Sequence, residues 1–451
     1  MQGTPALRFA IGALIILSAA ALIIPAITPH MPVVAGTEAR SADSGIDSLA
    51  LIQQAATQTP TPTPTATPIP QPTASVRPDL VVWWPVEFLP PQDTPEEAAV
   101  LDLIDTYRST ADISLLMRVK RLSGTGSILS TLRTGHPVAP GALPDLTLVR
   151  AAHLAQLVSD ELIFPLDANE ADTLLQHVYT RVTALGTVGD TLYGVPYALN
   201  VQHAVYPQVA FEATPDTFEE VLNAARLFAF ALGSDSGASD VLLIQYVAAG
   251  GRLTNDEGQR VLDEVPLRDV LRFYASAQAE ALLHPDSLTL TDAGQTWSLL
   301  VDGSVSLAQT DSDTFLRQQG SNAGLVPAAL PTRGGNLLTT LDGWVWVITT
   351  PDPNRQAQAR AFLDWLLQAE NQAALTEALH TLPSQRAALQ NRIDADYVAL
   401  IDRLLGNSNP ILAYQVDATT ATALQQALVA VLSGELSAEA AAETAAAQFA
   451  P

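Results

Sequence analysis

Short apolar and polar blocks alternate along most of the chain, and they predict strands and helices in turn. The run Leu80-Val81-Val82-Trp83-Trp84 is typical of a buried strand, and residues 113–119 and 146–149 are further strand candidates. Between them, Thr94-Pro95-Glu96-Glu97 predicts the capped start of a helix that extends to about Tyr107, and residues 127–133 predict another helix. Alternation of strand and helix with short connections predicts an α/β fold with a mostly parallel sheet.

The second half of the chain continues this alternation. Thr214-Pro215-Asp216-Thr217 predicts the start of a helix that we expect to reach Phe230. Residues 267–282 form an amphipathic pattern, 357–369 and 419–432 predict long helices, and 305–308 and 343–349 predict strands. The sequence has no internal repeat.

The first 78 residues differ in composition from the rest of the chain. Arg8 is the only charge before Glu38, and it precedes an apolar run of about 19 residues, 9–27, which is long enough to span a membrane. Residues 1–30 therefore predict a secretory signal peptide or a transmembrane anchor, and both remain open. In the segment TQTPTPTPTATPIPQPT, proline fixes φ and removes backbone donors, so residues 31–78 predict a disordered, extended Thr/Pro-rich linker.

Composition narrows the classes of partner and site. The chain is 48% hydrophobic and 15% charged, which is typical of a globular protein. Its formal net charge is −25, so it repels phosphate backbones, and we expect no nucleic-acid partner. It has no cysteine, which excludes disulfides, thiolate zinc sites, cysteine nucleophiles and anchoring through a lipidated cysteine.

A series of short motifs follows in order from residue 79 to residue 449. They are Trp83-Trp84 at the end of the first strand, Gly135, Pro144-Asp145-Leu146, Pro165-Leu166-Asp167, Tyr193-Gly194-Val195-Pro196, Pro215-Asp216-Thr217-Phe218-Glu219-Glu220-Val221, Asp302-Gly303, Val326-Pro327, Asp342-Gly343-Trp344, and Ser433-Gly434-Glu435. In order and spacing they resemble the extracellular solute-binding proteins of ABC importers, in particular the sugar-binding family that includes maltose-binding protein. The chain departs from that pattern in lacking a lipidated cysteine, in an insertion between Gly135 and Pro144, and in Phe218 at a position where tryptophan is usual.

The resemblance implies a periplasmic-binding-protein-like fold, in which two α/β lobes close on a hinge over an interlobe cleft. It implies one lobe from residues 79–198 and 327–378 and a second from 199–326 and 379–451. The hinge strands are expected near residues 197–202 and 327–332, with a third crossing near residue 380.

The chemistry of a sugar directs the choice of candidate binding residues. A sugar offers apolar C–H faces to aromatic rings and hydroxyls to carboxylate, amide and guanidinium groups, and ligands of such sheets bind at the strand ends. The candidates at strand ends and at the hinge are Trp83, Trp84, Glu87, Arg150, Tyr197, Asn200, Gln202, Asp311, Trp344 and Trp346. Core packing remains the alternative for the tryptophans, a plain surface position for Glu87, and an ion pair for Arg150.

Motifs for catalysis and cofactors are missing from the sequence. Lys120 has no glycines at phosphate-loop spacing, no serine lies in a nucleophile elbow, and the histidines lack metal-ligand spacing. We therefore expect no catalytic residue, no metal and no cofactor. Carboxylates are plentiful, but the sequence does not pair them for glycosidase chemistry.

These expectations favour an importer receptor rather than an enzyme. It would bind a small extracellular solute, by the resemblance a sugar or oligosaccharide, and deliver it to ABC permease transmembrane subunits. We expect a monomer at the outer face of the cell membrane, tethered through the N-terminal helix or secreted. The alternatives are a tethered sensor or scavenger of the same fold without transport, and a secreted hydrolase or lyase on a similar two-lobed body.

Overall fold

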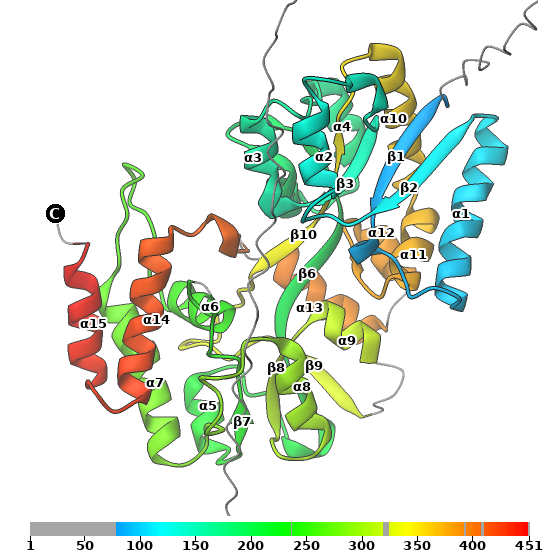
Figure 1. The fold of residues 1–451 in the computed structure, drawn as a ribbon. Coiled ribbons are helices and arrows are strands. Elements are labelled where there is room, and N and C mark those ends of the chain that lie inside the picture. Colours follow the sequence, from blue (N-terminus) through cyan, green and yellow to red (C-terminus); the bar gives the residue numbers. More distant parts are fainter. Residues whose placement is uncertain (1–77, 236, 319–323, 392–393, 407–409, 450–451) are drawn as a thin grey trace, which may run out of the picture. The chain divides into compact units, whose positions relative to one another are not determined.

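The structure, a computed structural model, describes residues 78–235, 237–318, 324–391, 394–406 and 410–449 (Figure 1). The expected signal peptide or anchor, and the Thr/Pro-rich linker up to residue 77, lie outside the described residues. Within the described ranges, no helix combines the length and the apolar character needed to cross a membrane.

Nine strands of the described chain form one mixed sheet, in which the main path runs in the order β2-β1-β3-β10-β6-β8-β7, with β9 and β11 also paired to β6. The strands are β1 (Leu80–Pro85), β2 (Leu115–Lys120), β3 (Leu146–Arg150), β6 (Gly194–Pro207), β7 (Phe228–Ala229), β8 (Leu307–Asp311), β9 (Leu325–Ala328), β10 (Leu341–Ile348) and β11 (Leu382–Pro383). A separate short hairpin joins β4 (Thr187–Val188) to β5 (Thr191–Leu192).

The long strand β6 joins the two halves of this sheet. Its first part pairs with β10, from Gly194 to Val201, and its second part pairs with β8 and β9, from Gln202 to Pro207. In Figure 1, β6 runs from the helices around β1–β3 to the helices around β7 and β8. The strand that begins with the Tyr-Gly-Val-Pro motif therefore crosses from one half of the sheet to the other.

The expectation of a mostly parallel sheet is wrong for this central region. Among the named strands of the described chain, the parallel pairs are β1–β2, β1–β3 and β7–β8. The pairs of β10 with β3 and β6, and of β6 with β8, β9 and β11, are antiparallel. The local alternation of strand and helix predicts parallel neighbours, but it carries no information on strands that pair across a long sequence separation.

The helices cover both halves of the sheet, and side-chain caps begin many of them. They are α1 (Pro95–Ala111), α2 (Ile128–Gly135), α3 (Leu154–Ser159), α4 (Ala168–Leu175), α5 (Phe218–Asn223), α6 (Asp240–Ala248), α7 (Glu264–Ala279), α8 (Ala293–Val301), α9 (Ser312–Gln318), α10 (Pro353–Leu366), α11 (Ala369–Ala378), α12 (Arg386–Gln390), α13 (Ala395–Gly406), α14 (Ala418–Leu432) and α15 (Ala438–Ala447). The Thr94 side chain accepts from Glu97 N at the start of α1, as the sequence predicts.

One predicted helix is much shorter than expected. The helix that begins after Thr217 ends at Asn223, and the chain turns at Ala225, where φ is +49°. Phe228 and Ala229 then form strand β7 and are buried. The prediction that this helix reaches Phe230 is wrong. Packing in the core, and not helical periodicity, decides that Phe228 forms part of a strand.

Two hydrophobic clusters form the core. The first contains buried side chains from β1, β2, β3, the first part of β6, β10 and helices α1, α10 and α13, with contributions from α8 and α9. The second contains side chains from β7, the second part of β6, α6, α7, α14 and α15. The first cluster also takes in Trp297, Phe315 and Ala329 from the segment between β6 and β10, so this packing does not separate two lobes at one set of residues. The lobe bounds and the third crossing near residue 380 that the resemblance implies stay predictions.

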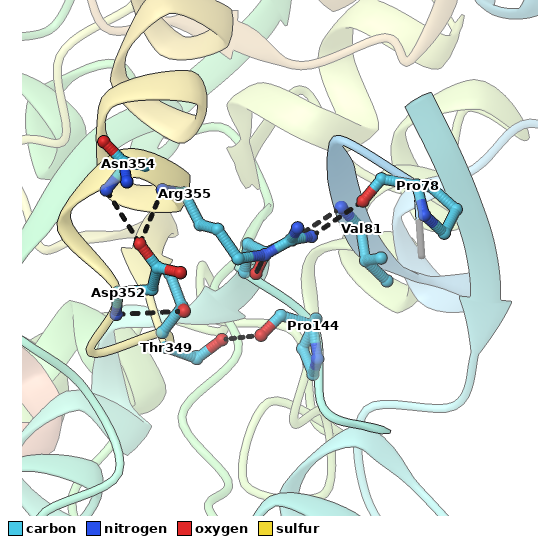
Figure 2. Close-up of polar contacts among 9 residues, drawn as sticks. Pro78, Val81, Pro144, Thr349, Asp352, Asn354 and Arg355 are labelled. Carbon is cyan, nitrogen blue, oxygen red and sulfur yellow. Dashed lines mark hydrogen bonds and ion pairs between the residues drawn. The ribbon is translucent and has the colours of Figure 1, made fainter. Parts of the chain in front are cut away.

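A buried ion pair connects β1, β3 and α10 in the first lobe. Arg355 Nε donates to Asp145 Oδ1 at 2.6 Å, and the Arg355 guanidinium also donates to Pro78 O at 3.0 Å. Asp145 Oδ2 accepts from Val81 N at 2.7 Å, and the Asp145 side chain is fully buried. Figure 2 shows Arg355 reaching from the start of its helix toward Pro78 and Val81. This pair fixes the point where the chain enters the folded body.

Candidate functional site

A cavity of about 550 Å³ lies where β6 crosses between the two halves of the sheet. Its walls are Gln202 on β6, Gln309 and Asp311 on β8, described residues of 231–235 and 237–239 with the start of α6, the start of α8, and Tyr414 with the start of α14. The volume falls in the range of ordinary small-molecule sites. We call it the hinge cavity.

Strand register brings Gln202 and Asp311 into the hinge cavity together. They are directly opposite partners in the antiparallel β6–β8 pair, so their side chains lie on the same face. Gln309 holds Gln202 in place by donating from Nε2 to Gln202 Oε1, and its own Oε1 accepts from Ala231 N at 3.3 Å. Asp311 Oδ1 accepts from Thr314 N at 2.7 Å, at the start of α9. These positions are set by backbone pairing and not by mobile loops.

Asp240 lines the same cavity from the first residue of α6, and Ser239 Oγ accepts from Leu242 N at 3.2 Å to cap that helix. Burial raises the pKa of Asp240 from its ordinary value of 3.8 to about 6, the Thr340 hydrogen bond opposes this, and the charges of Asp342 and Asp311 raise the pKa further. The two charged groups that shift the pKa of Asp240 are therefore both carboxylates.

Arg150 lies at the end of β3, opposite Trp344 on β10. Its guanidinium forms an ion pair with Asp342, two residues before Trp344, and lies 5.2 Å from the Trp344 ring centroid. The side chains of Arg150 and Asp342 remain about one-third exposed. The positive charge of Arg150 is therefore already compensated within its own lobe.

A second cavity, also of about 550 Å³, adjoins this ion pair. It is lined by Arg150, Trp344, the segment Glu87 to Pro91, and, from α9 and the end of α11, Asp313, Arg317, His380 and Thr381. Burial and the charge of Asp311 raise the pKa of Asp313 to about 7, while its hydrogen bond with Thr381, at 2.8 Å, and the charges of Arg317 and Arg150 lower it. Asp311 lines the hinge cavity and Asp313 this second one, so the two cavities flank one segment.

Five of the predicted binding residues line one of these two cavities. Gln202 and Asp311 line the hinge cavity, and Glu87, Arg150 and Trp344 line the second. The Glu87 carboxylate also accepts from Leu122 N, at 3.0 and 3.1 Å. Their role in binding stays a prediction, but the fold does bring these five residues to the crossing region.

The other five predicted residues lie elsewhere. Trp83, Trp84, Tyr197 and Trp346 are buried in the first cluster, where the Trp346 ring contacts the rings of Trp84 and Tyr197 at 5.2 and 6.2 Å. The alternative of core packing fits the three tryptophans, because both faces of β1 and β10 are covered, and Tyr197 on β6 is buried with them. Asn200 Oδ1 accepts from Ser312 Oγ at 2.9 Å and from Asp313 N at 3.3 Å, so it braces the start of α9.

Sequence reasoning missed Asp240, Ser239 and Gln309 as residues of this cavity. Ser239-Asp240 before an apolar run is a helix-start signal, and helix starts at the edge of a sheet are frequent ligand positions. Nothing in the sequence distinguishes this helix start from the others. Among the residues that the structure describes, no group of three or more histidine, aspartate or glutamate side chains could hold a metal ion.

The fold and the hinge cavity define a two-lobed binding protein, and comparison with known proteins assigns its family. The family described as bacterial extracellular solute-binding protein matches residues 117–400, more than half of the chain. The chain therefore belongs to this family. Its members bind solutes and are not catalysts, so the prediction of a non-enzyme is confirmed, as is the resemblance from which it came. No curated protein sequence matches the chain.

Solved structures show the same fold at low identity. The cyclic α-maltosyl-1,6-maltose binding protein of Arthrobacter globiformis is 16% identical, with a TM-score of 0.64, over 82% of this chain and 97% of that one. The maltose-binding periplasmic protein of Listeria monocytogenes is 14% identical (TM-score 0.63; 81% and 95% covered). The Thermus thermophilus maltotriose binding protein is 15% identical (TM-score 0.58; 82% and 98% covered). At these identities the likeness establishes the periplasmic-binding-protein-like fold.

Proposed function

We propose that this extracellular solute-binding protein is the receptor of an ABC importer and that it binds a sugar or oligosaccharide at the crossing of β6. The observation that carries the proposal is the hinge cavity, whose polar walls come from Gln202, Gln309 and Asp311 on adjacent strands. Amide and carboxylate groups held by backbone pairing suit the directed hydrogen bonds of a hydroxylated solute. The maltose- and maltotriose-binding proteins that share the fold support the sugar class.

The second cavity, whose walls come from β3 and β10 and also from α9, is the proposed continuation of this site. Trp344 offers an aromatic surface there, next to Arg150 and Glu87. A solute that contacts both cavities gains most when the lobes approach each other, so its binding energy would favour a closed form. The loaded, closed receptor would then dock on permease transmembrane subunits.

The expected membrane attachment belongs to this proposal. The apolar run 9–27 would tether or export the protein, and the Thr/Pro-rich segment would hold the folded body away from the membrane. The same arrangement suits a sensor or scavenger without transport. Measuring uptake of the bound solute in cells with and without the gene separates these functions, because only the importer receptor makes uptake depend on the protein.

Thermal unfolding of the full-length protein tests the binding function. A solute that binds only the folded state raises the melting temperature, and a concentration of 100 times Kd stabilises by about 2.7 kcal/mol. We expect a rise with one class of sugars and a smaller rise for Gln202→Ala, which removes a hinge-cavity amide. Gln356→Ala, on α10, is the matched control and should respond like the wild type. No rise in the melting temperature with any sugar would contradict the proposal.

A further inference from the structure

The charges of the hinge cavity are all of one sign. Asp235, Asp240, Asp292 and Asp311 line it, and none of the described residues in its walls is a lysine, arginine or histidine. The cavity itself, at the crossing of β6, defines the site. Its carboxylates decide which charge the site accepts.

The acidity of the whole protein does not explain this arrangement. The second cavity, on the other side of the segment Asp311–Asp313, contains Glu87, Glu96 and Asp313 but also Arg150, Arg317 and His380. The two cavities have the same volume and belong to the same acidic chain, yet only the hinge cavity lacks basic side chains among its described walls. The acidity is therefore local to the hinge cavity.

Arg150, whose guanidinium pairs with Asp342, does not compensate these carboxylates. Arg150 is engaged by Asp342, and Asp342 itself acts on Asp240 as a further like charge. Asp311 adds another, so Asp240 faces carboxylates from β8 and β10. Like charges in a partly buried site repel each other, and a bound cation removes that repulsion, whereas a neutral hydroxyl only donates a hydrogen bond.

The spacing of the carboxylates favours an organic cation over a metal ion. No three acidic or histidine side chains among the described residues are grouped closely enough to ligate one metal. A cavity of about 550 Å³ can hold a ligand of sugar size. Tyr414 adds an aromatic side chain to the wall, and such rings attract ammonium groups.

We infer that the solute of the hinge cavity carries at least one protonated amine and is an aminated sugar. Its ammonium group would lie between Asp240 and Asp311, and its hydroxyls would contact Gln202 and Gln309. This inference rests on the proposed function, since it names the solute class of that same site.

The test compares sugars that differ in the group, and so in the charge, at one position, by calorimetry and thermal unfolding of the full-length protein. Glucosamine and its oligomers carry a protonated amine, glucose and its oligomers carry a hydroxyl in its place, and N-acetylglucosamine and its oligomers carry a neutral acetamide. We expect binding by the aminated set and at least about tenfold weaker binding by both neutral sets, the difference that one charge-assisted hydrogen bond supplies. Spermidine, an amine without hydroxyls, tests whether charge alone suffices, and tighter binding by it than by the aminated sugars would overturn the sugar part of the inference.

Matched variants separate charge from folding. Asp240→Asn keeps the shape and removes one charge, and we expect it to weaken binding of the aminated set about tenfold without loss of stability. Asp160→Asn, on the surface near α3, removes the same charge away from the cavity and should leave binding unchanged. Equal binding of neutral and aminated sugars, or no effect of Asp240→Asn, would overturn the inference and leave the proposed function standing. Absence of binding by all of these ligands would contradict both.

Discussion

Arg150 and Asp342 form an ion pair between the adjacent strands β3 and β10, and Arg150 lines the second cavity. The pair joins residues that are 192 positions apart in the sequence. Its consequence is that the arginine expected to contact the solute is held by a carboxylate of the protein itself, while that carboxylate still acts on Asp240.

Arg150→Gln tests whether Arg150 contacts the solute directly or only pairs with Asp342. Because the pair is about one-third exposed, we expect a loss of only about 1 kcal/mol in the free energy of unfolding. If the solute is cationic, loss of this positive charge strengthens its binding severalfold. Calorimetry measures the affinity, and Arg133→Gln, which breaks the surface pair with Asp160, is the control. Weaker binding by the Arg150 variant would indicate direct contact between arginine and solute.

The ion pair of Arg355 with Asp145 is expected to matter much more for stability. Arg355→Met leaves a fully buried carboxylate without its partner, which costs about 3 kcal/mol or more of unfolding free energy. Urea unfolding measures the difference. Arg272→Met breaks the exposed pair with Glu439 and should change stability little. Equal effects of the two substitutions would contradict the structural role of the buried pair.

The raised pKa of Asp240 predicts a dependence of stability on pH. The folded pKa of about 6 exceeds the ordinary value of 3.8, so the folded state binds the proton more tightly and this group destabilises the protein as pH rises from about 4 to 6. Asp240→Asn should therefore raise the unfolding free energy at pH 8 by about 1–3 kcal/mol, and the gain should vanish near pH 4. Unfolding at both pH values measures it, and a gain that does not depend on pH would contradict the argument.

Trp344 and Trp346 are predicted to differ although they are two residues apart on β10. Trp346→Phe leaves space in a fully enclosed position and should cost about 1–3 kcal/mol of unfolding free energy. Trp344→Phe opens space toward the second cavity, where water or a side chain can fill it, so we expect a smaller cost. It should instead weaken binding of the solute that stabilises the wild type. A larger loss of unfolding free energy for Trp344→Phe than for Trp346→Phe would contradict the placement of Trp344 in the wall of the second cavity.

Gly343 on β10 pairs with Leu199 on β6. A Cβ there would stand 2.4 Å from Ala198 O and 3.0 Å from Leu185 Cδ1. Gly343→Ala therefore forces the crossing strands apart, and we expect a loss of about 1–3 kcal/mol in unfolding free energy. Gly141→Ala is the control, because nothing lies within 4 Å of its Cβ position. Denaturant unfolding of both variants checks this, and an unperturbed Gly343 variant would show that the strands can separate freely.

The part of the fold that sequence predicted is the part that local interactions determine. The start of α1 after Thr94, the strand at Leu80–Pro85 and the family motifs were recognisable, because caps and apolar runs act within a few residues. The surroundings of Trp83 and Trp84 could not be predicted. The two side chains point to opposite faces of β1, and both faces of this strand are covered. The prediction of where α5 ends failed for a similar reason, because packing in the core places Phe228 in a strand.

By itself, then, the sequence determined the class of fold, the family and the strand ends at which a solute site could form. The tertiary structure decided which side chains meet there. Asp311 on β8 and Asp342 on β10 both act on Asp240 at the start of α6, and β6 brings β8 and β10 into one sheet because it pairs with both. Charge repulsion between them depends on distance through space, and the order of residues along the chain does not contain that distance.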